Sequence, residues 1–185
     1  EGIGTTFAFD AGYLYRTPFG LRIGVNAANM GPTIFYIERE EADPIPFTIN
    51  AAVGYNRVFQ IEDVPLFGIA AEFRMEKEFV KNYIEKRPDP FWKAIFTSVE
   101  GSSLEDELLE AIYHWGAEIS FYNTGYGRIG FMEDPEGVRR EVSWGLGINV
   151  LNHFRWDFST IIEPWRQDKV RTGQWRISFT GTRLF

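Results

Sequence analysis

The chain has 185 residues, a formal net charge of −7 at pH 7 and no cysteine. The acidic balance argues against a nucleic-acid partner, and the absence of cysteine excludes disulfides, thiolate metal sites and a cysteine nucleophile. No run of about 18 apolar residues is present, so the sequence predicts no transmembrane helix.

Alternation of apolar and polar residues with a period of two recurs along almost the whole chain and predicts strands. In the segment 142–150, for example, one face carries Trp144 and Ile148 and the opposite face carries Ser143 and Gly145. In chain order the predicted strands are 5–16, 19–29, 46–56, 66–75, 112–123, 126–132, 142–150, 154–162 and 175–185. The predicted fold is therefore all-β and antiparallel, with nine strands.

The segment 76–111 interrupts this pattern. Its residues 103–111 predict a short amphipathic helix with Ser102 or Ser103 as the N-cap and acidic residues in the first turn. A second helix is expected near 76–86. A connection of this length with its own helices is more often functional than a plain loop.

Two architectures explain the strand pattern, a soluble sandwich and a membrane barrel. The polar face of a sandwich should carry lysine, but all five lysines fall between the strands: Lys77, Lys81, Lys86, Lys93 and Lys169. The polar face instead carries small residues and the ions Asp10, Arg22, Glu72, Arg74, Glu118, Arg128, Arg155 and Asp157. Ions of mixed sign suit an enclosed interior, so the pattern favours a transmembrane barrel with a paired ionic network in its lumen. A solute pathway is the alternative role for these ions.

Connection lengths alternate, which is typical of outer-membrane barrels. The short connections are 17–18, 57–65, 124–125 and 151–153, and the long ones are 30–45, 76–111, 133–141 and 163–174. If the C-terminus is periplasmic, every long connection lies outside the cell. The aromatic residues of the apolar face then form two membrane girdles. The outer girdle is Trp115, Trp144 and Trp175, and the periplasmic girdle is Tyr15, Phe19, Tyr55, Trp156 and Phe185.

The motifs that could indicate catalysis, cofactor binding or metal binding are weak in this sequence. Residues 125–130 spell GxGxxG, but they open a strand, whereas dinucleotide binding needs a helix to follow. His114 and His153 lie near opposite ends of their strands, so neither a shared metal site nor a catalytic pair with Ser143 is expected. Residues 134–137 lack the spacing of a calcium loop. The sequence therefore predicts no enzymatic activity, no cofactor and no metal.

Several short motifs are each weak indicators of a family when taken alone. Their order and spacing along the chain are more specific. The motifs are Asp10–Tyr15, Gly24–Gly31, Pro44–Pro46, Glu107–Ile112, His114–Glu118, Arg128–Phe131, Gly145–Gly147 and Asp157–Phe158. Together they resemble the PorV/PorQ family of outer-membrane barrels, a FadL-like group associated with type IX secretion. The resemblance covers most of the chain apart from 30–43 and 76–103.

The resemblance implies a bacterial outer-membrane barrel of about fourteen strands, built from a chain roughly twice as long. This chain resembles the C-terminal portion, and its opening Glu1–Gly4, without an initiator methionine, also suggests a longer polypeptide. Nine strands would leave an edge exposed to lipid, so we expect missing residues or another chain to supply further strands. The implied partners are membrane lipid, secreted cargo proteins and other subunits of the secretion system.

Three functions follow as hypotheses. The first is a component of protein secretion that binds or shuttles exported proteins through its external loops. The second is a FadL-like transporter of hydrophobic solutes, and the third is a purely structural β-protein. For the first, we expect the partner site at Phe91, Trp92, Ile95 and Phe96, an apolar cluster larger than a solvated loop needs. The alternative is that these residues cap or plug the barrel.

Overall fold

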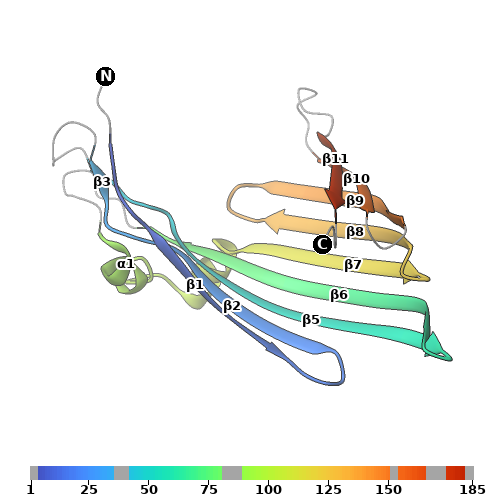
Figure 1. Cartoon of the computed structure of the whole chain (residues 1–185). Coiled ribbons are helices and arrows are strands. Elements are labelled where there is room, and N and C mark those ends of the chain that lie inside the picture. Colours follow the sequence, from blue (N-terminus) through green and yellow to red (C-terminus); the bar gives the residue numbers. More distant parts are fainter. Residues whose placement is uncertain (1–3, 36–41, 81–88, 151–153, 166–173, 182–185) are drawn as a thin grey trace. The chain divides into compact units, whose positions relative to one another are not determined.

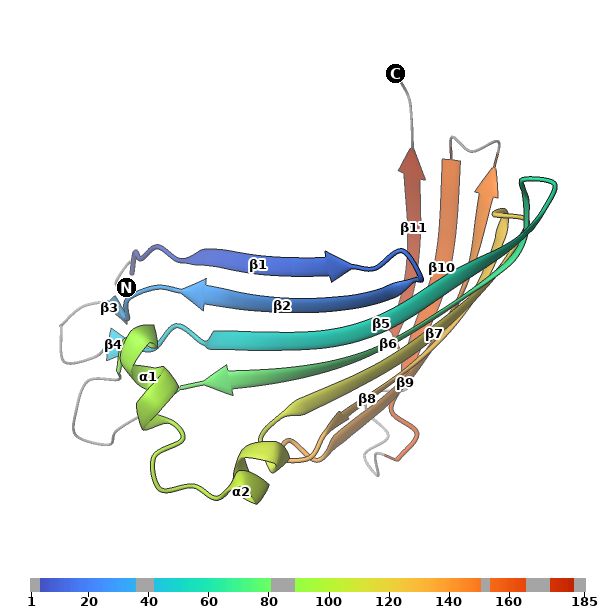
Figure 2. The ribbon, with the colours of Figure 1, turned by 90° about the horizontal axis from the view of Figure 1, so that it is seen from below.

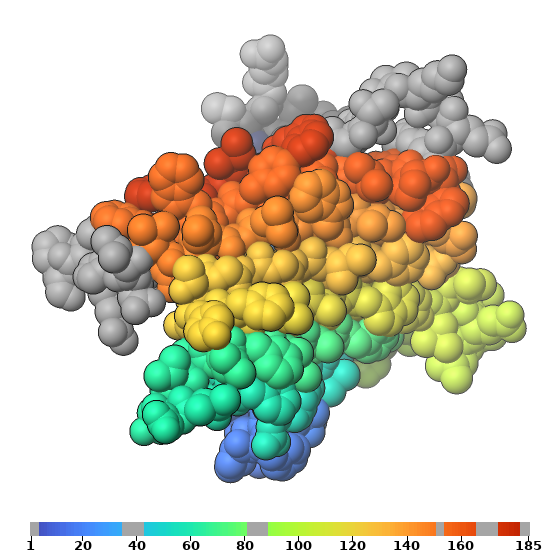
Figure 3. Space-filling view, turned by 90° about the vertical axis from the view of Figure 1, so that its right-hand side faces the viewer, coloured from blue at the N-terminus to red at the C-terminus, as the bar shows by residue number. Residues whose placement is uncertain are grey.

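A computed structural model describes residues 4–35, 42–80, 89–150, 154–165 and 174–181 (Figure 1). Within these ranges, one antiparallel sheet contains nine strands, each paired with its neighbours in chain order. They are β1 (Phe9–Arg16), β2 (Leu21–Met30), β5 (Phe47–Ile61), β6 (Val64–Phe79), β7 (Ile112–Phe121), β8 (Gly125–Asp134), β9 (Arg139–Val150), β10 (Phe154–Ile162) and β11 (Gln174–Gly181). The nine predicted strands are confirmed. Figure 3 shows the order as successive bands of colour.

The large sheet has two edges, β1 and β11, and is open. A closed barrel would require these strands to pair with each other or with further strands. The structure therefore confirms the antiparallel all-β part of the predicted fold, and the sheet formed by these nine strands is not closed.

Two connections are tighter than predicted. β5 and β6 extend toward each other until only Glu62 and Asp63 remain between them, with φ of 48° and 62°. Two successive left-handed residues are typical of the mirror-image turn that joins tight hairpins. The connection 133–141, predicted to be long, is a turn over 135–138 in which the Gly137 N–H donates to Asp134 Oδ1 at 2.8 Å. The residues that prolong β8 and β9 are charged, so the apolar alternation ended too early there, whereas β5 continues through Val58, Phe59 and Ile61, which the predicted connection had included.

Two short helices follow β6. α2 (Leu104–Leu109) confirms the predicted helix and its N-cap, because the Ser103 hydroxyl accepts from the Asp106 N–H while Asp106 accepts from the Ser103 N–H. α1 (Phe91–Thr97) was not predicted as a helix. The helix predicted near 76–86 is wrong in its first part, because residues 76–79 complete β6, and 81–86 lie outside the described residues. No helix in the described part of the chain is long and apolar enough to cross a membrane.

The chain divides into two compact units. The first comprises 1–15, 24–51 and 75–112, and the second comprises 16–23, 52–74 and 113–185. The first unit also contains a pair of two-residue strands, β3 (Ile34–Phe35) and β4 (Ala42–Asp43), and Figure 2 shows α1 and α2 in the connection from β6 to β7. Its core is small. Phe47 is 2% exposed and contacts the rings of Phe79 and Phe91 at centroid distances of 5.8 and 5.6 Å, and Ala94 and Ala111 are also buried.

In the second unit the two faces of the sheet differ in an unusual way. On β9, Leu146 and Ile148 are 58% and 49% exposed, whereas Gly145 on the opposite face is buried. The register continues this division, since Ile148 lies opposite Trp156, and Trp156 lies opposite Phe179. We call the side with Leu146 and Ile148 the apolar face and the side with Gly145 the polar face. A half-solvated antiparallel sheet normally buries its apolar face, and this sheet exposes it.

Candidate functional site

Four charged side chains of the polar face form a continuous chain of ion pairs. Arg128 donates from Nε to Glu118 Oε2 and from Nη1 to Asp157 Oδ1, both at 2.5 Å. Arg155 Nε donates to the other oxygen of Asp157 at 2.9 Å. Glu118 and Arg128 lie directly opposite each other on β7 and β8, which explains the first pair. Two cations and two anions balance, so the chain links β7, β8 and β10 without a net charge.

Gly147 allows Arg128 and Asp157 to meet. β9 lies between the strands that carry them, and Gly147 is the register partner of Asp157. A Cβ at Gly147 would lie 2.6 Å from Asp157 Oδ1 and 3.4 Å from Arg128 Nη2. A side chain at this position would therefore occupy the space through which the ion pair forms.

The ring of Tyr126 supports both guanidinium groups of the network. Its centroid lies 4.5 Å from Arg155 Cζ and 5.6 Å from Arg128 Cζ, within the range of cation–π attraction. The Tyr126 hydroxyl donates to Asn123 Oδ1 at 2.8 Å, which fixes the ring. Tyr126 was not among the network residues predicted from the sequence. Its even spacing from Arg128 was the available signal that both lie on one face.

A hollow in the polar face adjoins this chain of ion pairs. Its polar lining consists of Arg22, Glu72, Glu118, Arg128, Ser143 and Ser159. Arg22 Nη2 and Glu72 Oε2 both lie beside Gly54, at 3.7 and 3.6 Å from the position of a Cβ there. The hollow is therefore charged, and the predicted network residues Arg22 and Glu72 share it with Glu118 and Arg128.

Two predicted members of the network, Asp10 and Arg74, do not line this hollow. Asp10 belongs to the first unit, where its carboxylate accepts a hydrogen bond from the Asn29 N–H at 2.8 Å. Asn29 has a φ of 61°, so this bond holds a left-handed residue at the end of β2. Arg74 lies two residues beyond Glu72 on β6.

The predicted girdle residues that the structure describes are exposed. They are Tyr15, Phe19, Tyr55, Trp115, Trp144, Trp156 and Trp175. Trp144 and Trp175 share one row, because both lie opposite Thr160 on β10. Trp156 lies four residues along β10 from that row, about 13 Å away at the usual rise of a strand. Phe185 lies outside the described residues.

The apolar face of the second unit contains an apolar groove. It is lined by Leu21, Val53, Tyr55, Ala71, Phe73, Trp115, Ala117, Ile129, Phe131 and Val142, together with Gly54, Glu72, Gly116 and Gly130. Phe73, Trp115 and Phe131 form a row of contacting rings with centroid distances of 5.5 and 5.4 Å.

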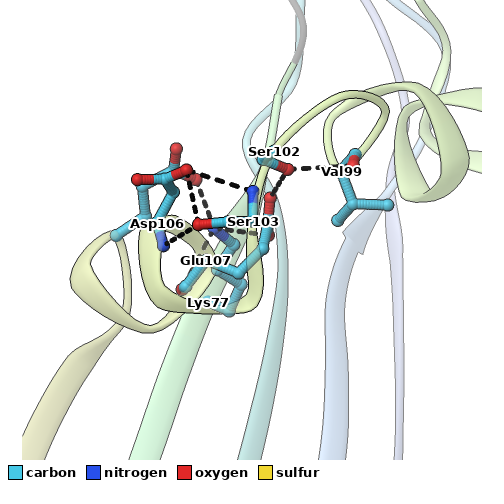
Figure 4. Close-up of polar contacts among 7 residues, drawn as sticks. Lys77, Val99, Ser102, Ser103, Asp106 and Glu107 are labelled. Atoms are coloured by element: carbon cyan, nitrogen blue, oxygen red, sulfur yellow. Dashed lines mark hydrogen bonds and ion pairs between the residues drawn. The ribbon is translucent and has the colours of Figure 1, made fainter.

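In the first unit, Lys77 ties α2 to the end of β6 (Figure 4). Its side chain is buried, and Nζ pairs with Glu107 Oε2 at 3.0 Å and with the carboxylate of Glu110. Ser102 donates its hydroxyl to Glu107 as well. We call Lys77, Glu107 and Glu110 the α2 clamp. The sequence placed Lys77 only between strands, and burial of this lysine depends on the tertiary position of α2.

In the α2 clamp, the pKa values of Glu107 and Lys77 are both shifted in the direction that keeps the side chain charged. The hydrogen bond from Ser102 lowers the pKa of Glu107, and Lys77 lowers it further. Burial alone would lower the pKa of Lys77, but its hydrogen bonds to Glu110 and Glu107 raise the pKa above the ordinary value. Both groups therefore stay charged over a wider pH range than in the unfolded chain.

The predicted partner site on α1 separates into two parts. Phe91 is an anchor, since its ring contacts Phe47 and lies 6.1 Å from the ring of Phe9. Trp92 and Phe96 are 56% and 72% exposed, and their spacing of four places them on one side of the helix. Ile95 is partly covered.

Asp89, which was not predicted from the sequence as a functional residue, fixes α1 through hydrogen bonds to two side chains of the helix. Its buried carboxylate accepts hydrogen bonds from Lys93 Nζ at 2.7 Å and from Thr97 Oγ1 at 2.8 Å. An acidic residue just before the first turn was the available sequence signal.

The other motifs occupy ordinary positions. Residues 125–130 lie in β8, and β9 rather than a helix follows them. Ser143 lies opposite Gly130 and Ile161, His114 lies in β7, and His153 is outside the described residues. Among the described residues, no group of three His, Asp or Glu side chains is placed to hold a metal ion.

No protein-family model matches the sequence. No curated protein matches it significantly either.

Replacing Gly147 with Ala should separate Arg128 from Asp157, because the added methyl group occupies the path of their ion pair. Overpacking of this kind costs about 1–3 kcal/mol, measurable as the free energy of unfolding in a urea titration. Gly116→Ala is the matched control, since its nearest neighbour would lie at 4.0 Å. Equal losses in the two variants would show that the ion pair does not depend on Gly147.

The α2 clamp should open in acid. Glu107 has a lowered folded pKa, so its contribution is present above the ordinary value of 4.5 and is lost as the pH falls through the folded pKa. Lys77, with its raised pKa, contributes below 10.5 and loses its contribution only above that value. Hydrogen exchange of the α2 amides, corrected for the intrinsic rate, should therefore show protection at pH 6 that is lost below the ordinary value of 4.5. In Lys77→Met this acid-dependent step should shrink, and an unchanged step would contradict the assignment.

Proposed function

We propose that the chain forms part of the wall of a transmembrane β-barrel in a bacterial outer membrane and serves in protein export. The observation that supports the barrel wall is the exposure of the apolar face, together with the small and ionic residues on the more covered polar face. Burial of apolar surface stabilises a protein by about 25 cal/mol per Å², and surface that stays in water does not gain this free energy. Lipid can cover such a face without a second protein layer.

A soluble sandwich explains the apolar face less well. It requires a second sheet against that face, with inward side chains from both layers forming the core. Apart from the nine strands, the only strands among the described residues are β3 and β4, two residues each, which belong to the first unit. The second sheet of a sandwich would therefore have to come from outside the described residues.

The polar face suits a barrel interior. Glu118, Arg128, Asp157 and Arg155 balance one another there, as ions in the interior of a barrel would have to, and glycine leaves room for them. A hydrophobic solute crossing this side would displace water from the charged hollow without offering partners to the ions. This disfavours the FadL-like transport hypothesis for the part of the lumen that these strands would form.

The open sheet needs completion in a membrane. Unpaired backbone groups of an edge strand cost several kcal/mol each in hydrocarbon, so β1 and β11 require partners. In the proposed assembly further strands pair with these two edges. They come from a longer polypeptide or from another chain.

The role in export rests on the resemblance to the PorV/PorQ family, and the exposed side of α1 offers a place for it. Trp92 and Phe96 stay exposed while Phe91 and the buried Asp89 hold the helix in position. A pair of exposed aromatic side chains on an anchored helix is typical of protein contact sites. We therefore assign cargo or secretion-subunit binding to Trp92 and Phe96 rather than to all four predicted residues.

The barrel wall is tested by introducing arginine on each face of one strand. Ile177 and Ser178 are neighbours on β11, and Ser178 lies opposite Asp157. Ile177→Arg should cost about 2–4 kcal/mol if the site is near the bilayer midplane, whereas Ser178→Arg lies on the polar face beside Asp157, which already pairs with Arg128 and Arg155, and should cost less. The measurement is the amount of assembled protein in the detergent-extracted outer membrane of the source cells. Equal amounts, or recovery of the unmodified chain as a detergent-free soluble monomer, would contradict a lipid-facing apolar face.

The export role is tested on α1. Trp92→Ser combined with Phe96→Ser should weaken co-purification of exported proteins and lower their secretion, because the exposed rings are removed while the Phe91 anchor remains. The amount of the chain in the membrane should not change. Leu104→Ser is the control, since Leu104 is an equally exposed apolar residue on α2. If secretion survives the double change, the partner site lies elsewhere.

A further inference from the structure

The apolar groove is a local depression in a face that is otherwise covered with large side chains. On β6, Ala71 lies between Ile69 and Phe73 in the alternation, and on β7, Ala117 lies between Trp115 and Ile119. Ala71 and Ala117 are both exposed, so the short side chains form an accessible floor. The contacting rings of Phe73, Trp115 and Phe131 form one wall.

The chemistry of the groove is uniform. Its lining side chains on this face are aliphatic or aromatic, and the polar atoms among them are the hydroxyl of Tyr55 and the indole N–H of Trp115. Glu72 also lines the groove, but its Oε2 atom lies beside Gly54, as Arg22 Nη2 does, and Glu72 lines the hollow of the polar face as well. The ions of these strands are thus kept on the opposite side. The charge distribution excludes an ionic ligand and matches an uncharged, apolar one.

The groove is long as well as apolar. It is lined by residues of six consecutive sheet strands, from Leu21 on β2 to Val142 on β9. Five strand spacings of about 4.8 Å give a length of about 24 Å. One leaflet of the hydrocarbon core is about 15 Å thick, so an extended chain of that length fits within the groove.

We propose that the groove binds one acyl chain of a membrane lipid, which the rings of Phe73, Trp115 and Phe131 hold in place. The inference rests on the proposed function, because it requires the apolar face to be in contact with the bilayer. Within that frame it adds a specific lipid site to a surface that would otherwise contact lipids without preference. Tyr55 and Trp115 can each turn one polar atom toward the headgroup region while the ring contacts the chain.

The test uses quenching of tryptophan fluorescence by lipids brominated on the acyl chain. Two forms of the full chain are made in which only Trp115 or only Trp156 remains and the other five tryptophans are Phe. Each form is reconstituted into phosphatidylcholine vesicles that contain the brominated lipid. Trp115 lines the groove, and Trp156 lies on the same face but does not line it. We expect stronger quenching of Trp115 than of Trp156.

Filling the groove provides the decisive comparison. Ala117→Phe and, as a second variant, Ala71→Phe occupy the floor and should remove the excess quenching of Trp115 while leaving that of Trp156 unchanged. An excess that persists in both variants, or Trp115 quenched no more than Trp156, would overturn the acyl-chain site while leaving the barrel wall intact. Quenching of Trp156 without any quenching of Trp115 would show that a protein partner covers the groove. Absence of quenching at both positions would overturn the proposed function itself.

Discussion

The exposed apolar face is the constraint on which the other features depend. A single sheet can bury one of its faces only against another layer, and the described residues of the second unit provide no such layer. Leu146, Ile148 and Trp156 therefore need a medium or partner that accepts hydrocarbon. The lipid bilayer that we propose would cover this face, and it would leave the ions on the opposite side of the sheet.

The polar face shows how a sheet can carry balanced charges on one of its sides. Arg128 reaches acids on either side of its own strand, and the glycine on β9 leaves the space that the longer contact needs. Tyr126 adds an aromatic ring against which the two guanidinium groups rest. Strands β7, β8 and β10 are thus linked by side chains as well as through the backbone hydrogen bonds of the sheet, which favours one register over its alternatives.

The first unit meets a different requirement, because two short helices must be held on very little core. Phe47 and Phe91 supply the apolar contact, and two buried ionic residues, Lys77 and Asp89, supply directed bonds. Helices of seven and six residues are too short to be stable alone. Their position therefore depends on these anchors, and the side chains not needed for anchoring, Trp92 and Phe96, remain exposed.

The period-two alternation determined the nine strands and the division of their side chains between two faces, because side-chain direction along a strand is fixed by local geometry. The capping residues of α2 were equally local. Strand ends such as 76–79 were misjudged because charged residues there interrupt the apolar pattern.

Other features depend on residues far apart in the chain. The sequence named Arg128 and Asp157 as members of one network, but only the register of β8, β9 and β10 decided that they meet across Gly147. It named Phe91 and Phe96 together, but only the position of Phe47 decided that one is an anchor and the other is exposed. The alternation predicts on which face of the sheet a side chain lies. Its contacts depend on residues of other strands and helices, whose positions only the tertiary structure gives.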